Sequence, residues 1–256
     1  MFKPPFLFLL GFLLLYGCVP PPDGRTQPEA ASSISDGIPA VLGERFMVAA
    51  ANPHAAKAGR RILHQGGSAV DAAIAMQMVL NLVEPQSSGI GGGGFLLHYD
   101  SASGHVAALD GRETAPAGAT AKMFLDLFGE PKAFFEAVVG GESVGVPGLL
   151  RMLELAHGRH GKLPWAALFA PAIELAEAGF AVSSRLHGLI AEDKYLRASA
   201  NAGDYFYTPG SGALAVGEIR VNRPLARAFL AVAQEGAAVF YEGFIARDVV
   251  AAVRGA

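Results

Sequence analysis

Five of the six residues from 89 to 94 are glycine, within the stretch PQSSGIGGGGFLLHYD that occupies positions 85–100. Backbone this bare permits two arrangements that side chains would forbid. Glycines let a strand begin beside another backbone with no side chain in the way. Alternatively, successive backbone N–H groups can line a pocket or support an oxyanion. The residues alone leave both interpretations open.

The same glycines satisfy G-x-G-x-x-G, the pattern of a dinucleotide-binding loop, but their surroundings argue against that function. Such a loop follows a strand and opens a helix, whose N-terminal N–H groups bind the pyrophosphate. Here the order is reversed, because a helical segment precedes the glycines and a strand-like segment follows them. The sequence therefore disfavours a dinucleotide site.

Strand and helix signals stand on the N-terminal side of this loop. Residues 45–51 are apolar and alternate weakly, which predicts a first strand. Asn52 followed by Pro53 predicts a helix start, because the asparagine caps the first turn and proline costs nothing at the first helical position. Gly66 and Gly67 are expected to end this helix.

A second helix is predicted from 69 to about 82. Ser68 and Asp71 form a start like a capping box, with Asp in place of the usual Glu. The segment is apolar nearly all round, which indicates burial on more than one side. After the glycines, residues 95–99 and 105–109 predict a β-hairpin. Beyond residue 140 the pattern is mostly helical.

Composition argues against two broad classes of protein. Hydrophobic residues make up 52% of the 256 residues and charged residues 17%, which is ample for a buried core and unlike a disordered chain. The formal net charge is -3 and no basic run is present, so we expect no nucleic-acid partner. Cys18 is the single cysteine, so no internal disulfide can form.

Residues 1–17 predict an export signal, because Lys3 precedes an apolar run that is too short for a comfortable membrane span. The run ends in LYGC, which resembles the bacterial lipobox, so we expect lipidation of Cys18. An ordinary signal peptide with an incidental cysteine is the alternative. Residues 18–43 predict a flexible tether ahead of a domain at 44–256. This organisation predicts an exported bacterial protein of the periplasm, held at the membrane where Cys18 carries lipid.

Several separate stretches resemble one family. NLVEPQSSGIGGGGFLLHYD is followed in order by LDGRETAP, GGESVGVPG, HGRHGKLPWAALFAPAIELAEAGFAVS and RPLARAFLAVAQEGAAVFYEGFIARDVV. Together they resemble the N-terminal part of the large subunit of γ-glutamyltransferases, also called glutathione hydrolases. The resemblance covers about residues 44–254 and rests on long motifs in the family's order.

The resemblance implies an α+β fold, the αββα sandwich of N-terminal nucleophile hydrolases. It also implies a precursor that cuts itself before a threonine, giving a large and a small subunit. The new N-terminal threonine attacks the γ-amide of glutathione or another γ-glutamyl compound, with its own α-amine as the base. The glutamyl group then passes to water or to an acceptor amino acid or peptide. We expect no cofactor and no metal.

Arg112 is the candidate substrate-binding residue. It matches the arginine of the family's arginine-glutamate-x-alanine-proline motif, present here as RETAP at 112–116. The resemblance implies that this arginine holds the α-carboxylate of the substrate. A guanidinium suits that role, because its planar fork of donors matches a carboxylate and keeps its charge. An ordinary ion pair with Asp110 or Glu113 is the alternative.

The catalytic threonine of the family has no counterpart in this sequence. None of the four threonines (Thr26, Thr114, Thr120 and Thr208) stands in a threonine-threonine-histidine context. We therefore expect an incomplete large subunit that is inactive alone, with no catalytic residue of its own. The histidines show no metal-ligand spacing, and His157 and His160 are expected in a loop without a carboxylate partner.

Two other functions stay open at this point. One is a related acylase of the same architecture, acting on cephalosporins or glutaryl compounds. The other is a lipoprotein without catalytic activity that keeps the scaffold as a binding module. The tyrosines and phenylalanine at 205–207 line a substrate opening or anchor a loop.

Overall fold

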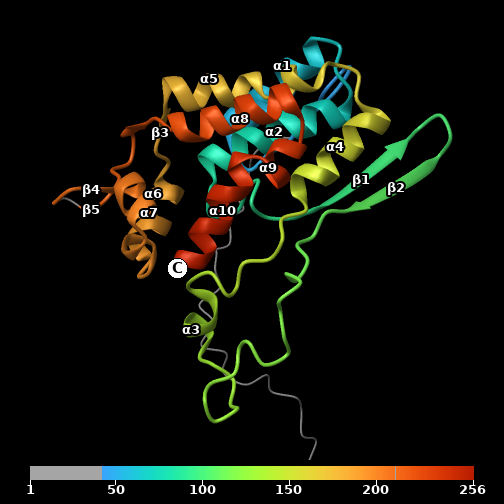
Figure 1. Cartoon of the computed structure of the whole chain (residues 1–256). Helices are drawn as coiled ribbons and strands as arrows, with labels where there is room; N and C mark the ends of the chain where they lie inside the picture. The colour runs from blue at the N-terminus through green and yellow to red at the C-terminus, as the bar shows by residue number, and fades with distance from the viewer. Residues whose placement is uncertain (1–41, 211) are drawn as a thin grey trace, which may run out of the picture. The chain divides into compact units, whose positions relative to one another are not determined.

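A computed structural model of the chain describes residues 42–210 and 212–256 (Figure 1). The export signal, Cys18 and nearly all of the expected tether lie outside these residues. The described residues belong to one compact unit, residues 37–256. Among them, no helix combines the length and the apolar character that a membrane span requires.

Helices dominate the described residues, and the strands form three separate antiparallel pairs, β1–β2, β3–β6 and β4–β5. The helices are α1 (Pro53–His64), α2 (Ala69–Val83), α3 (Phe134–Val138), α4 (Leu149–His160), α5 (Ala170–Ala178), α6 (Ser184–Glu192), α7 (Ala200–Phe206), α8 (Arg223–Glu235), α9 (Ala238–Glu242) and α10 (Phe244–Gly255). The strands are β1 (Phe95–Asp100), β2 (His105–Asp110), β3 (Phe180–Ala181), β4 (Tyr207–Thr208), β5 (Gly212–Ala213) and β6 (Ile219–Arg220).

α1 begins as its sequence predicts. The Asn52 side chain accepts a hydrogen bond from the His54 N–H at 3.0 Å, and Pro53 stands in the first turn. Gly66 follows the helix with φ +88°, a conformation that favours glycine. On its exposed side, Arg61 donates two hydrogen bonds to Glu174 of α5 at 2.6 and 2.9 Å. These bonds lower the pKa of the Glu174 carboxyl.

α2 is the buried centre of the helical part. Ser68 and Asp71 form the predicted capping box, each side chain accepting from the backbone N–H of the other residue. Ten of the 15 residues of α2 are buried, and the helix packs against α1, α4 and α5. Glu84 follows it and is itself buried, with its carboxylate bonded to Asn52, Gln86 and Arg185.

The β1–β2 hairpin projects away from the helices at its turn (Figure 1), and its two faces differ in how well they are covered. The covered face carries Leu96, Ala107 and the buried Leu109, and His98 stacks on His160 of α4 with ring centroids 3.8 Å apart. The opposite face carries a row of exposed apolar side chains: Phe95, Leu97, Tyr99, Val106 and Ala108. Among the described residues neither strand pairs with a third one.

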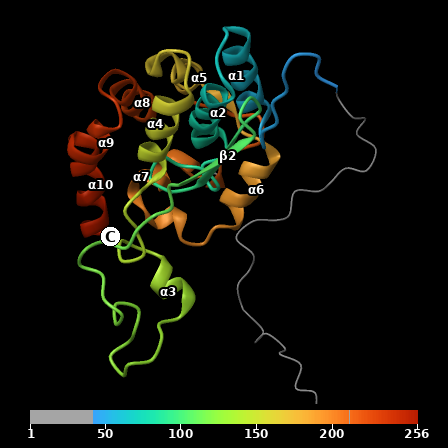
Figure 2. The same cartoon turned by 90° about the vertical axis from the view of Figure 1, so that its right-hand side faces the viewer.

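A long arm, residues 115–144, leaves the hairpin and returns to α4 (Figure 2). None of its residues is buried, and α3 is its only helix. Its tip is a tight turn in which the Asp126 carboxylate accepts the N–H groups of Phe128 and Glu130 at 2.8 and 2.9 Å. Leu127 and Phe128 at this tip are almost fully exposed, at 101% and 90%.

Two expectations about local structure are wrong. Residues 45–51 do not form a strand, since no neighbouring strand among the described residues pairs with them. His157 and His160 are not in a loop, because α4 continues to His160 and Gly161 follows it. Of the residues at 205–207, Tyr207 anchors its segment, because it is buried and its hydroxyl donates to the Ile190 carbonyl at 2.9 Å.

Candidate functional site

Arg112 lies just past the end of β2, where the hairpin ladder continues for one more pair. The Gly94 N–H donates to the Gly111 carbonyl at 3.1 Å, and the Gly111 N–H donates to the Gly94 carbonyl at 2.9 Å. The Asp110 carboxylate accepts the N–H of Arg112 at 2.9 Å, so the backbone at Arg112 is fixed from both sides. The Arg112 side chain is 61% exposed and free to meet a ligand from solvent.

The glycine loop, residues 89–94, packs against the segment that carries Arg112. A Cβ on Gly93 would lie 2.6 Å from the Gly111 carbonyl oxygen and 2.8 Å from the Cα of Arg112. Such contacts are too short for real Cβ atoms, so the two backbones approach at a distance that only glycine allows. Close backbone approach is therefore what this loop provides.

The start of α4 completes the junction. The Gly92 carbonyl accepts the N–H groups of Gly148 and Leu149, both at 3.2 Å, and a Cβ on Gly148 would lie 2.5 Å from the Gly111 carbonyl oxygen. Thr114 and Val146 form an antiparallel bridge on the other side of Arg112. Three segments distant in the sequence, 89–94, 110–114 and 145–149, thus meet around one cation.

Glu113 is the acidic neighbour of this cation. Its Oε2 lies 3.0 Å from Arg112 Nη1, and its side chain is 29% exposed. The ion pair expected as the alternative for Arg112 is therefore present with Glu113. Substrate binding by Arg112 stays a prediction, and its side chain remains 61% exposed. Thr114, the threonine nearest to Arg112 in the sequence, is committed through its backbone to the bridge with Val146.

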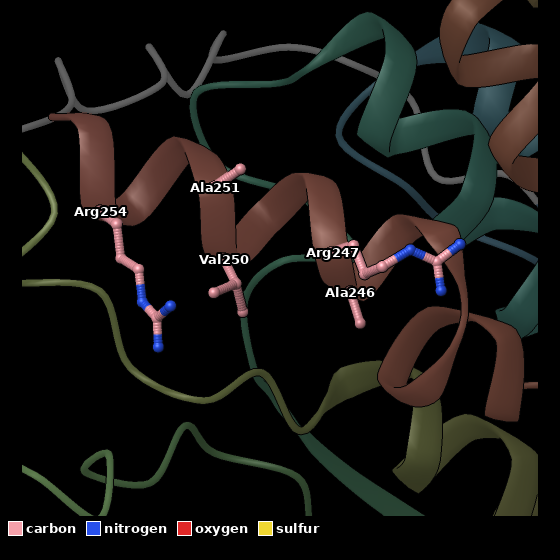
Figure 3. A pocket seen from close by; sticks show the side chains of 5 residues that line it. All are labelled: Ala246, Arg247, Val250, Ala251 and Arg254. Carbon is pink, nitrogen blue, oxygen red and sulfur yellow. The ribbon is translucent and has the colours of Figure 1, made fainter.

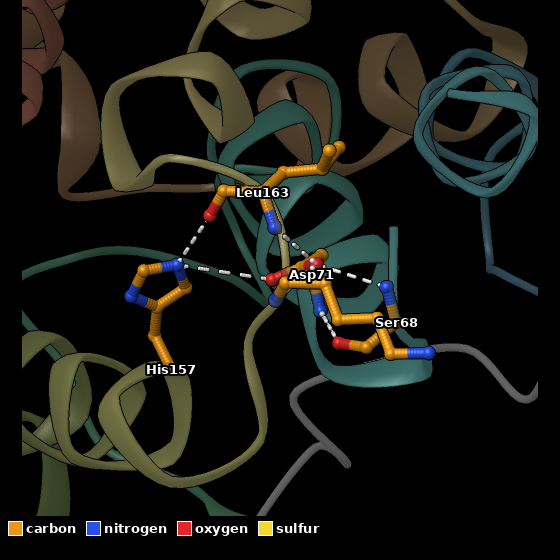
Figure 4. Close-up of polar contacts among 5 residues, drawn as sticks. Ser68, Asp71, His157 and Leu163 are labelled. Carbon is orange, nitrogen blue, oxygen red and sulfur yellow. Dashed lines mark hydrogen bonds and ion pairs between the residues drawn. The ribbon is translucent and has the colours of Figure 1, made fainter. Parts of the chain in front are cut away.

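Other polar groups lie away from Arg112. Asp71 is fully buried, and its Oδ2 accepts the N–H groups of Ser68, Lys162 and Leu163 at 2.8, 2.9 and 3.1 Å (Figure 4). His157 donates from Nε2 to the Leu163 carbonyl at 2.8 Å, and the same nitrogen lies 3.8 Å from Asp71 Oδ1. His157 therefore has a carboxylate neighbour, contrary to expectation, because the sequence does not reveal that α2 and α4 are adjacent.

Among the described residues, the two best-defined depressions are shallow, and neither includes Arg112. One runs along α10 between Arg247 and Arg254, over Val250 (Figure 3). The other lies beside α1 and is lined by Glu44, Arg45, Phe46, Arg60 and His64. The part of the chain that the structure describes holds no group of three His, Cys, Asp or Glu side chains suited to a metal ion. Cys18, the expected lipidation site, lies outside that part.

The family model described as gamma-glutamyltranspeptidase matches residues 55–256. The chain belongs to the γ-glutamyltranspeptidase family. It is 39% identical to the glutathione hydrolase proenzyme of Bacillus subtilis (strain 168) over 94% of its own length, but spans only 40% of that relative. The chain therefore spans less than half the length of this γ-glutamyltranspeptidase relative.

Solved structures of γ-glutamyltranspeptidases support the same assignment. The Helicobacter pylori enzyme matches with a TM-score of 0.78 and 32% identity, covering 82% of this chain and 60% of that one. A cephalosporin acylase from Bacillus halodurans matches with a TM-score of 0.60 and 29% identity, covering 86% and 42%. The predicted α+β class and the likeness to N-terminal nucleophile hydrolases are confirmed. The described residues do not themselves contain two stacked sheets.

Proposed function

We propose that this chain is the large-subunit portion of an enzyme that hydrolyses or transfers the γ-glutamyl group of glutathione and related compounds. The observation that supports this most directly is the position of Arg112. Its guanidinium stands at the end of a fixed hairpin, and its other nitrogens remain available beyond the Nη1 contact with Glu113. A fork of donors at a rigid position suits the α-carboxylate of a γ-glutamyl compound.

The nucleophile of this reaction belongs to a small subunit cut from the same precursor. The proenzyme name of the Bacillus subtilis relative, which is longer than this chain, supports a processed precursor. The uncovered hairpin face supports a missing partner, because five apolar side chains in a row are costly to leave in water. Both free edges of the hairpin can also accept further strands.

An acylase of the same architecture is the second candidate. The cephalosporin acylase match supports it, but its TM-score is lower than that of the Helicobacter pylori enzyme.

Export to the periplasm with lipid on Cys18 completes the proposal and rests on the N-terminal sequence alone. Mass spectrometry of the mature N-terminus tests it: a lipidated Cys18 is expected, and an unmodified residue other than Cys18 would contradict it.

The decisive experiment compares Arg112 variants of the complete self-processed precursor with a chromogenic γ-glutamyl anilide. Arg112→Lys keeps the charge but loses the fork, so KM should rise about tenfold to a hundredfold. Arg112→Gln should raise KM further, because no cation remains. Arg60→Gln, on the exposed side of α1, is the matched control and should leave KM unchanged.

The same assay includes the 256-residue chain alone and a glutaryl anilide as competitor substrate. We expect no turnover by the chain alone, because it lacks the nucleophile. Unchanged KM in Arg112→Gln, or faster turnover of the glutaryl anilide than of the γ-glutamyl anilide, would reject the proposed substrate. Turnover by the pure 256-residue chain would contradict the proposal that the nucleophile belongs to a separate small subunit.

A further inference from the structure

Glu113 holds its position beside Arg112 through few polar contacts. Its Oε2 is buried and makes no hydrogen bond among the described residues, and the ion pair with Arg112 Nη1 at 3.0 Å is the contact that the structure shows. Adjacent residues on an extended chain direct their side chains to opposite sides, so this pair does not form by sequence proximity alone. Something outside the segment must hold the carboxylate.

Three glycines surround Glu113, and we call Gly92, Gly93 and Gly145 the glycine cradle. A Cβ on Gly92 would lie 3.4 Å from Oε1, one on Gly93 would lie 2.7 Å from Oε2, and one on Gly145 would lie 2.8 Å from the Glu113 Cβ. The first contact is tight and the other two are too short for real atoms. The Glu113 side chain therefore occupies space that a side chain at Gly93 or Gly145 would fill, and its carboxylate lies close against Gly92.

The remaining glycines of the loop have no such neighbour. A Cβ on Gly91 would meet nothing within 4 Å, and one on Gly89 would meet only a backbone nitrogen at 3.9 Å. The closeness to Glu113 is thus a property of particular positions in the loop and not of glycine content in general. This contrast supplies a matched control for any substitution in the glycine cradle.

A fixed carboxylate at Nη1 has two opposing effects on a ligand at the rest of the guanidinium. It holds the planar fork in one orientation, which favours a bidentate partner. It also places a negative charge near the carboxylate of the ligand, which disfavours that ligand. The two effects predict opposite changes in KM when the Glu113 charge is removed, so an experiment can separate them.

We propose that the glycine cradle makes Gly92 and Gly93 positioning residues for substrate binding, which act by seating Glu113 against Arg112. This inference rests on the proposed function of Arg112 as the α-carboxylate contact and names the part of the glycine loop that serves it. Orientation outweighs repulsion in this arrangement, because Glu113 is confined by the cradle while the guanidinium is more than half exposed.

The first test uses the 256-residue chain itself and does not depend on activity. The side-chain Nε–H resonance of Arg112 is followed by ¹⁵N NMR relaxation in the wild type and in Gly91→Ala, Gly92→Ala and Glu113→Gln. Positioning predicts a restrained Arg112 side chain in the wild type and in Gly91→Ala. It predicts faster motion in Gly92→Ala and Glu113→Gln. Equal mobility in all four proteins would overturn the proposal.

The second test measures KM and kcat of the complete self-processed precursor with the γ-glutamyl anilide. We expect Gly92→Ala and Glu113→Gln to raise KM roughly fivefold to twentyfold with kcat nearly unchanged, because binding loses preorganisation and the nucleophile is untouched. Gly93→Ala should raise KM more, but its Cβ would also meet the Gly111 carbonyl oxygen. If Gly93→Ala does not fold, the test rests on Gly92→Ala.

The outcomes separate this proposal from the proposed function. A lower KM in Glu113→Gln would mean that repulsion dominates and would overturn the positioning role. A wild-type precursor without γ-glutamyl activity would reject the proposed function, while the NMR comparison would still decide whether the glycine cradle orients Arg112. Equal KM in Gly91→Ala and Gly92→Ala would overturn the part assigned to Gly92.

Discussion

At the scale of single residues, Asp71 shows how one carboxylate can join segments that are far apart in the sequence. Its capping-box bond to the N–H of the N-cap residue Ser68 is local and could be predicted, because a capping box needs residues only three positions apart. Its bonds to the N–H groups of Lys162 and Leu163 could not, since they span 91 and 92 positions. The same limit applies to Arg112. Its RETAP motif predicts a contact with the α-carboxylate of a substrate, but the motif does not reveal that glycines distant in the sequence pack against this segment.

Asp71 also supplies a stability prediction. Asp71→Ala removes the acceptor of three backbone N–H groups in the buried junction of α2 with residues 162–163, so the free energy of unfolding should fall by about 2–4 kcal/mol. Asp71→Asn keeps an acceptor oxygen and should lose less. Urea denaturation of both variants checks this, with the exposed Glu177→Gln as control. Similar losses for Ala and Asn would show that charge, and not the acceptor, matters most.

At the scale of elements, the helices with local start signals and the hairpin could be predicted, whereas the strand predicted at 45–51 does not form. α1 and α2 begin at Asn52 and Ser68 because capping residues act within one turn. Residues 45–51 have an apolar pattern suited to a strand, but a strand is stable only when another strand pairs with it. The hairpin formed because its two strands lie next to each other in the sequence and bring their own partner.

The two faces of that hairpin should respond differently when a lysine replaces a leucine. Leu97→Lys, on the uncovered face at 75% exposure, should change the unfolding free energy of this chain by less than about 0.5 kcal/mol. Leu109→Lys, on the face packed against α4, should cost about 3–5 kcal/mol. Thermal melts of the isolated chain measure both effects.

In the self-processed precursor that we propose, Leu97→Lys should instead reduce the yield of associated large and small subunits, because the uncovered face is where we expect the partner to pack. Co-purification of the two subunits measures this yield. A Leu97→Lys precursor that matures and associates as well as the wild type would mean that the partner contacts another surface.

At the scale of the whole molecule, the exposed apolar side chains concentrate in two regions of the described residues. The uncovered hairpin face and the arm at 115–144 together hold twelve of the large hydrophobic side chains that are exposed: Phe95, Leu97, Tyr99, Val106, Phe124, Leu127, Phe128, Phe134, Phe135, Val138, Val139 and Val144. The helical core around α2 is by contrast well buried. The described residues thus combine a well-buried core with two exposed apolar regions, the uncovered hairpin face and the arm.

The exposed arm allows assembly to be followed by limited proteolysis. Chymotrypsin cuts after large apolar residues, and the tip presents Leu127 and Phe128 to solvent on a segment with no buried residue. The isolated 26.5-kDa chain should therefore be nicked first within the arm, leaving two fragments of about 13 kDa each. If the mature enzyme covers the arm, nicking slows as assembly proceeds, and the fraction of uncut protein reports how many molecules have found their partner. Equal digestion rates before and after maturation would mark the arm as permanent outer surface.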